Sequence, residues 1–290
     1  MEALAAVGVS FERQFWQKER FVSPYGQVSV IDVKPETVTD QIPILIAPGW
    51  SEDYQTYRKT LKTAFNSSRR ALSLEYSRLS GSVIGNEGYP EVELRKARLI
   101  LDMLKKKGID RADVIAHSEG AINVLIAAML KPEQFRNIVL DKPAGLVGKD
   151  TRSTLTGRFI RMLLEETIIR PPLFMDPASS VSICERITLY ALVNPASITK
   201  EMDAITTFEI KDLMEALQNR GVMLSVISGV HDPLFPVSKQ IGYMRETGVP
   251  SMKGYYSVVG GHNELSIHAN KHATLAINAL DGLQRLRSSR

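Results

Sequence analysis

The stretch Ala116-His117-Ser118-Glu119-Gly120 decides how this chain is expected to fold. It follows a short apolar run, Asp113-Val114-Ile115, and it precedes an almost wholly apolar segment from Ala121 to Leu130. A serine in a sharp strand-to-helix turn needs small residues two positions before and after it, because the strained backbone leaves no room for larger side chains. The pattern therefore predicts a strand, a tight turn that presents Ser118, and a helix buried on several sides.

Composition excludes some classes of partner. The chain has 290 residues, of which 44% are hydrophobic and 23% charged, which is the balance of a globular protein. Its net charge is only +4 and its basic residues are scattered, so no nucleic-acid partner is expected. The run Lys105-Lys106-Lys107 stands at the end of an expected helix, where cations complement the helix dipole. No apolar run approaches the ~20 residues that span a bilayer, so no membrane span is expected.

The compartment and the cofactor content can be argued from a few residues. Cys184 is the only cysteine, which rules out an intrachain disulfide and fits a reducing compartment. Residues 1–10 lack a basic leader and a cleavage site, so the expected location is cytoplasmic. None of the five histidines has the spacing of a zinc site, and we expect neither a metal nor another cofactor. The oligomeric state is left open.

Short β-like segments alternate with longer helical ones along most of the chain. This order is typical of an α/β fold with a mostly parallel sheet covered by helices on both faces. The turn Ser23-Pro24-Tyr25-Gly26 predicts that the first two strands form an antiparallel pair. The expected strands are 11–21, 27–33, 42–47, 70–74, 113–115, 137–140, 222–228 and 255–259. The expected helices are 91–107, 121–130, 238–247 and 264–286.

This alternation stops between Leu146 and Phe208. Helices are expected at 157–170, ended by Pro171-Pro172, and at 183–192. A helical insertion between two core strands is more typical of a lid than of an independent domain. We therefore expect a core made of residues 1–145 and 209–290, with a helical cap over residues 146–208.

Two later strand ends carry the residue types that a reactive serine needs. A serine hydroxyl is a poor nucleophile until a base takes its proton, and that base works best when a carboxylate orients it. The strand at 222–228 runs into a turn that presents Asp232, and the strand at 255–259 runs into a glycine turn that presents His262. The carboxyl ends of parallel strands share one sheet edge, so Ser118, Asp232 and His262 can meet there.

A tetrahedral intermediate also needs hydrogen-bond donors for its negative charge. The amide of Glu119 starts a helix and is one expected donor, and the amide of Trp50, in the loop Pro48-Gly49-Trp50, is the other. A carboxylate beside a developing oxyanion would oppose it, so the Glu119 side chain is expected to point away into a hydrogen bond. Trp50, Phe159 and Met162 are candidates for a substrate pocket, with plain packing as their alternative role.

The sequence resembles the α/β-hydrolase family over about residues 25–285, in particular serine-nucleophile members with a cap, such as esterases and lipases. The order Ser118, Asp232, His262 matches the family order of nucleophile, acid and histidine. Two departures stand out: Ala116 replaces the first glycine of the family's Gly-x-Ser-x-Gly turn, and Ala47-Pro48 stands where many members have a histidine. The resemblance implies a nucleophile elbow, a catalytic triad, an oxyanion hole and a cap domain.

Alternatives follow from the same residues. Asp141, at the end of the preceding strand, is the rival to Asp232, while His117, His231 and His268 are the weaker candidates for the base. The leading functional hypothesis is a serine hydrolase for small to medium carboxylic esters, with a small ester-like molecule as its partner. Other triad chemistry is the alternative, namely carbon–carbon bond hydrolysis, aminopeptidase, lactonase, thioesterase or acyltransferase activity. A receptor on the same scaffold that has lost turnover is the alternative from another class.

Overall fold

An eight-stranded sheet forms the centre of the molecule in the computed structural model, which describes residues 11–80, 88–165, 188–190 and 192–289. Its strand order is β1-β2-β4-β3-β5-β6-β7-β8. The first two strands are antiparallel to each other, β2 is antiparallel to β4, and the remaining neighbours are parallel. The strands are β1 (Lys18–Ser23), β2 (Gly26–Val33), β3 (Asp40–Ala47), β4 (Arg69–Leu79), β5 (Ala112–His117), β6 (Phe135–Asp141), β7 (Met223–Gly229) and β8 (Gly254–Val258).

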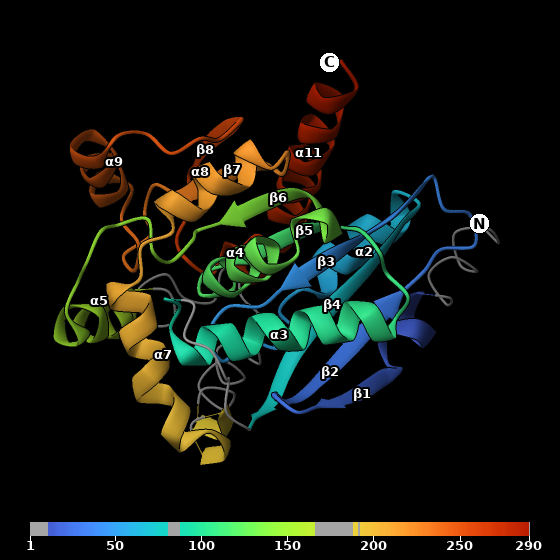
Figure 1. Cartoon of the computed structure of the whole chain (residues 1–290), viewed down its shortest axis with the longest axis horizontal. Coiled ribbons are helices and arrows are strands. Elements are labelled where there is room, and N and C mark those ends of the chain that lie inside the picture. The colour runs from blue at the N-terminus through green and yellow to red at the C-terminus, as the bar shows by residue number, and fades with distance from the viewer. Residues whose placement is uncertain (1–10, 81–87, 166–187, 191, 290) are drawn as a thin grey trace.

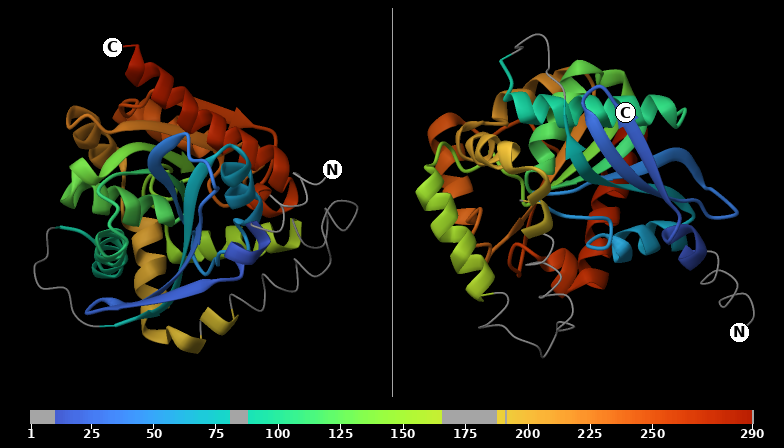
Figure 2. Two further views of the ribbon diagram at one scale, coloured as in Figure 1. Left: turned by 90° about the vertical axis from the view of Figure 1, so that its right-hand side faces the viewer. Right: turned by 90° about the horizontal axis from the view of Figure 1, so that it is seen from below.

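Helices cover both faces of this sheet, as Figure 1 and the right-hand view of Figure 2 show. One face carries α3 (Glu91–Lys106), α4 (Gly120–Leu130) and α8 (Lys211–Asn219), and the other carries α2 (Arg58–Asn66) and α11 (Ala269–Ser288). Successive side chains of a strand point to opposite faces. In β3, Leu45 and Ala47 accordingly belong to the hydrophobic core between the sheet and α3, α4 and α8. Ile44 and Ile46 belong to the core between the sheet and the helices α2 and α11.

The predicted helix after Ser118 is confirmed as α4, and every residue from 120 to 128 in it is buried. It lies between α3 and α8 and against the sheet, which explains why its sequence has almost no polar face. The predicted helix 91–107 is confirmed as α3. It ends at Lys106, and Gly108 follows with a φ of +63°, which is a conformation that glycine adopts without strain.

The prediction of a strand from residue 11 was wrong for its first half, because residues 11–15 are helical. Phe11 and Phe15 are four residues apart, so a helix brings both rings to one face, where they are fully buried and lie 5.7 Å apart. The expected helix 264–286 is divided at His268 into α10 (Glu264–Ile267) and α11. Sequence reading also missed α2 and α8, although Leu213, Met214 and Leu217 of α8 form an apolar stripe.

The segment 146–208 supplies α5 (Arg152–Leu164) and α7 (Pro195–Thr207), which lie beyond the carboxyl ends of the parallel strands (Figure 1). The described part of this segment contains no strand. Helix α5 starts earlier than predicted because the Thr151 side chain accepts a hydrogen bond from the Thr154 amide and caps it. The end of the predicted helix 157–170, most of the one at 183–192, and Cys184 lie outside the described residues.

Helix α9 (Val237–Thr247) lies between β7 and β8 in the sequence, and it begins one residue earlier than predicted. In the described part of the chain, no helix combines the length and the apolar character needed to cross a membrane.

Candidate active site

Ser118 stands in the turn between β5 and α4 with a φ of +52°, a left-handed conformation that only a constrained turn imposes on serine. The small residues around it are required by close contacts. A Cβ atom on Gly120 would lie 2.5 Å from the carbonyl oxygen of Pro48, and one on Gly49 would lie 2.9 Å from the Ser118 Cβ. The loop after β3 therefore packs directly against the turn that presents the serine.

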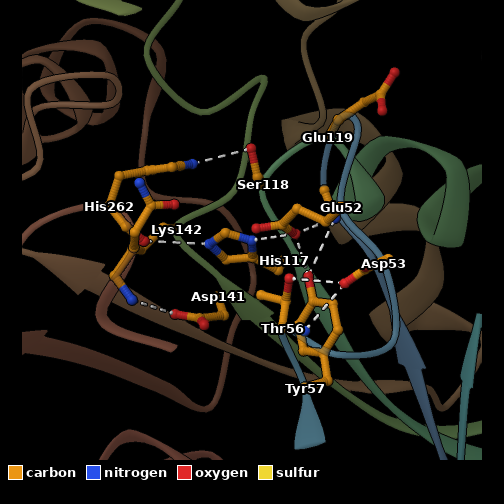
Figure 3. Close-up of polar contacts among 12 residues, drawn as sticks. Glu52, Asp53, Thr56, Tyr57, His117, Ser118, Glu119, Asp141, Lys142 and His262 are labelled. Atoms are coloured by element: carbon orange, nitrogen blue, oxygen red, sulfur yellow. Dashed lines mark hydrogen bonds and ion pairs between the residues drawn. The ribbon is translucent and has the colours of Figure 1, made fainter. Parts of the chain in front are cut away.

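Ser118, His262 and Asp232 form one hydrogen-bonded chain at the carboxyl ends of β5, β8 and β7. The Asp232 Oδ2 atom lies 2.8 Å from His262 Nδ1, and His262 Nε2 lies 3.2 Å from Ser118 Oγ, the contact drawn in Figure 3. Because an ionised carboxylate only accepts, Nδ1 carries the proton, and Nε2 is left to accept the hydrogen bond from the serine hydroxyl. All three residues are buried.

The loops that carry Asp232 and His262 are bonded to each other. The amide of His231 donates to the carbonyl of Gly260, and the amides of Leu234 and Phe235 donate to Asp232 Oδ1. Burial alone would raise the pKa of Asp232, but the neighbouring His262 and these hydrogen bonds lower it below its usual value. Asp232 is thus held ionised and aimed at the histidine.

Asp141, the rival acid, does not contact His262. Its carboxylate lies 2.6 Å from His272 Nε2 and 3.0 Å from Lys142 Nζ, and all three side chains are buried. Burial opposes the ionised form, but the charges of His272 and Lys142 outweigh it and hold the pKa of Asp141 far below its usual value. The geometry therefore places Asp232, and not Asp141, beside the histidine that reaches Ser118.

The two expected backbone donors, the amides of Trp50 and Glu119, belong to the loop after β3 and to the turn after β5, which pack against each other. The Gly49 amide is already used, since it donates to Glu52 Oε2 at 2.7 Å and to the Tyr57 hydroxyl at 3.2 Å. Among the described residues, neither the Trp50 amide nor the Glu119 amide donates to a protein acceptor. The prediction that the Glu119 side chain turns away from Ser118 is confirmed (Figure 3), and its Oε1 atom lies 2.7 Å from Lys96 Nζ.

His117 packs beside His262, with ring centres 4.9 Å apart, and its Nδ1 atom donates to Glu52 Oε2 at 2.9 Å. Glu52 also accepts a hydrogen bond from the Tyr57 hydroxyl (Figure 3). Burial would raise the pKa of Glu52, but the charge of His117 and these hydrogen bonds lower it to about 2. Glu52 therefore ties the loop Pro48-Gly49-Trp50 to His117, the last residue of the strand before the serine.

A largely apolar cavity of about 380 Å³ opens in front of Ser118 and His262. Helices α5 and α7 form one wall, and the loop after β7 forms another. The candidate pocket residues Trp50, Phe159 and Met162 all line it, and the Trp50 and Phe159 rings meet edge to face at 5.6 Å. The further apolar lining residues are Leu155, Ile198, Met202, Ile205, Leu234 and Phe235. The cavity is of the size of a small-molecule site.

The remaining sequence candidates lie apart from this chain of contacts. His231 is exposed, and His268 Nδ1 is bonded to Glu264 Oε2, whose other oxygen accepts from the Gly261 amide. Within the described ranges, no group of three or more His, Cys, Asp or Glu residues is arranged to hold a metal ion.

Comparison with models of known protein families finds no match. A search of curated protein sequences likewise finds no match.

Solved structures, in contrast, match along nearly the whole chain. A membrane phospholipase A, described as a bacterial virulence factor, matches 98% of this chain and 92% of its own with a TM-score of 0.69 and 16% identity. An esterase from Thermogutta terrifontis matches 92% of this chain and 99% of its own, with a TM-score of 0.63 and 13% identity. A bromoperoxidase from Bacillus anthracis matches 90% of this chain and 100% of its own, with a TM-score of 0.66 and 12% identity. The predicted α/β-hydrolase fold is confirmed.

Sequence reasoning did not find several residues that hold this site. Glu52 follows the loop Pro48-Gly49-Trp50 at no recognisable motif spacing. Lys96, which bonds Glu119, and Glu201, which accepts from the Trp50 indole, belong to helices whose charged residues usually face solvent. Lys142 gave one signal, since it follows Asp141 directly at a strand end. Its left-handed backbone, with a φ of +47°, became visible only in the structure.

Proposed function

We propose that this protein is a cofactor-free serine hydrolase that cleaves small to medium carboxylic esters. The observation that carries this proposal is the hydrogen-bonded chain from Asp232 through His262 to Ser118, which ends at an apolar cavity. The likeness in fold to a solved esterase and a solved phospholipase supports hydrolysis as the reaction class. Fold alone would be weak support, because unrelated functions share it.

The residues have separate roles in the proposed reaction. Ser118 Oγ attacks the ester carbonyl while His262 Nε2 takes its proton, and Asp232 stabilises the imidazolium that forms. The amides of Trp50 and Glu119 donate to the oxyanion of the tetrahedral intermediate. His262 then protonates the leaving alkoxide, which leaves an acyl group on Ser118. Water, activated by the same histidine, attacks this acyl-enzyme and releases the carboxylic acid.

The segment 146–208 is proposed to act as the cap, over a core made of residues 1–145 and 209–290. Its helices α5 and α7 contribute Leu155, Phe159 and Met202 to the cavity wall. Apolar walls stabilise an acyl chain by removing it from water, at about 0.8 kcal/mol for each buried methylene. An ester with its carbonyl at Ser118 would place its acyl chain against α5 and α7. Because these walls are largely apolar, they favour an uncharged acyl chain.

The proposal is tested with a fluorophosphonate probe that phosphonylates an activated serine. The wild type is expected to be labelled and Ser118→Ala is not. Ser51→Ala is the matched control, because Ser51 also lines the cavity and should leave labelling intact. Turnover is measured on nitrophenyl esters from acetate to octanoate, with thioesters and lactones as comparison substrates. Absence of labelling and turnover in the wild type would contradict the proposal, and labelling of Ser118→Ala would identify another serine.

A further inference from the structure

A buried ionic cluster connects the two residues whose backbone amides are the proposed oxyanion donors. Lys96 of α3 places its Nζ atom 2.7 Å from Glu119 Oε1 and 2.8 Å from Glu201 Oε1 of α7. None of the three side chains is more than 1% exposed. The cluster therefore joins three parts of the molecule: α3, the residue after Ser118, and a helix of the 146–208 segment.

The same cluster reaches the oxyanion loop from the other side. Trp50 Nε1 donates to Glu201 Oε2 at 2.9 Å, and the Tyr190 hydroxyl donates to Glu201 Oε1. A continuous series of contacts thus runs from Trp50 through Glu201 and Lys96 to Glu119. Its two ends are the two residues whose backbone amides are proposed to bind the oxyanion.

Stability does not explain why ionised groups are kept here. Ion pairs removed from water lose their hydration, and well-packed apolar side chains of similar volume are often at least as stable. The surroundings make the arrangement more costly, since a third carboxylate, Glu93, is buried in the cluster. Burial and the charge of Glu119 raise the pKa of Glu93 well above its usual value, which is the cost of burying a further carboxyl group beside them.

The two carboxylates stabilise the Lys96 ammonium, whereas burial outweighs the charge of Lys96 at Glu119 and raises the pKa of that carboxyl above its usual value. Burial would lower the pKa of the Lys96 ammonium, but Glu119 and Glu201 outweigh it and hold that pKa well above its usual value. Lys96 thus stays charged between its partners. Charged hydrogen bonds of this kind are short and directional, and they restrict the side chains of the two residues that carry the amides.

We infer that Lys96 and Glu201 are positioning residues that hold the Trp50 and Glu119 amides at the spacing an oxyanion requires. Lys96 acts through the Glu119 side chain, and Glu201 acts through the Trp50 indole. Because Glu201 belongs to α7, the positions of the two amide donors depend on how this helix packs against the core. The inference rests on the proposed function, since it needs Ser118 to pass through a tetrahedral intermediate.

Glu201→Leu is the decisive variant. It removes the acceptor of Trp50 Nε1 but leaves Lys96 paired with Glu119, so the remaining charges stay balanced and the fold should persist. We expect kcat on nitrophenyl butyrate to fall by roughly 10- to 100-fold with little change in KM, because only the transition state carries the oxyanion. The limiting rate of fluorophosphonate labelling should fall with kcat. Glu201→Gln keeps an acceptor for the indole, so its kcat should stay close to that of the wild type.

Glu91→Gln is the matched control. The exposed pair Glu91–Lys200 joins the same two helices at 2.8 Å, so its loss tests a purely structural link between them. It should leave kcat unchanged. The chain has only two tryptophans, so in a Trp16→Phe background the fluorescence reports Trp50 alone. Its emission should shift in Glu201→Leu and stay unchanged in Glu91→Gln.

The outcomes separate the two proposals. If the wild type is neither labelled nor active, the proposed function fails. If the wild type is labelled and active but Glu201→Leu keeps the wild-type kcat, the positioning role is wrong, even where the Trp50 emission shifts. If Glu201→Leu does not fold, Trp50→Phe takes its place, because it removes the same hydrogen bond without touching a charge. A wild-type kcat in folded Trp50→Phe would likewise overturn the inference.

Discussion

The Asp141 carboxylate lies 2.6 Å from Nε2 of His272, on the same sheet edge where Asp232 lies 2.8 Å from Nδ1 of His262. Two aspartate–histidine pairs therefore stand at neighbouring strand ends, and among the described residues only the second has a serine on its far nitrogen. Lys142 Nζ lies 3.0 Å from Asp141, so the carboxylate of the first pair also has a lysine partner. We interpret the first pair as structural and the second as chemical.

Exchanging each aspartate for asparagine should separate these roles. Asp232→Asn would hold His262 in the wrong tautomer, and a loss of kcat of roughly 10⁴-fold is the measured effect of this change in the type case. Asp141→Asn should keep kcat within a few-fold but lower the free energy of unfolding by about 3–5 kcal/mol, because it breaks a buried ionic group. Steady-state rates and urea unfolding of both variants provide the measurements. The reverse pattern would make Asp141 the acid of the triad.

Gly49 is predicted to be required for space rather than for backbone freedom. An added Cβ would lie 2.7 Å from Glu52 Oε2 and 2.9 Å from the Ser118 Cβ, so the oxyanion loop would have to move. We expect Gly49→Ala to lower kcat by at least ~10-fold, since a donor displaced by about 1 Å loses much of its effect. Gly242→Ala in α9 is the control, because nothing lies within 4 Å of its added methyl. Equal rates in the two variants would contradict this account of the loop.

Glu52 should make the fold sensitive to acid. Its pKa is lowered from 4.5 to about 2 in the folded protein. The stabilisation is therefore fully present above pH 4.5 and is lost as the pH falls through the range from 4.5 to about 2. Across that range, the free energy of unfolding should fall less in Glu52→Gln than in the wild type, and the difference should be on the order of 3 kcal/mol. Urea unfolding at several pH values measures it, and an unchanged slope would contradict the prediction.

The parts of the fold that depend on local pattern could be predicted from the sequence. The strand before Ser118 and the helix after it follow from an apolar run, a set of small residues and a second apolar run. Asp232 and His262 could be placed because parallel strands end at one edge. The residues 11–15 misled the strand prediction, since two phenylalanines four apart suit a helix but also occur in strands.

The contacts that support the site could not be predicted in the same way. Trp50 and Glu201 are 151 residues apart in the sequence, and no periodicity connects them. Lys96 occupies a helix in which charged residues are expected to face solvent, and only the arrangement of α3, α4 and α7 buries it. Long-range pairing of this kind is determined by tertiary packing and leaves no signal in a single sequence.

The cavity wall formed by α7 leads to a last prediction, on acyl chain length. Ile198 is half-buried and lines the cavity, so Ile198→Trp should fill part of the space that a long acyl chain would use. Each methylene excluded from the wall forfeits about 0.8 kcal/mol, so the ratio of kcat/KM for octanoate over butyrate should fall by at least ~10-fold.

Ala196→Trp is the matched control for this change, because Ala196 lies on the exposed side of the same helix and adds the same bulk outside the cavity. It should leave the octanoate-to-butyrate ratio unchanged. Butyrate itself should be hydrolysed at a similar kcat by both variants, since a short chain does not reach the altered wall. An equal fall of the ratio in both variants would mean that the helix moved, and no change in either would place the acyl chain elsewhere than beneath α7.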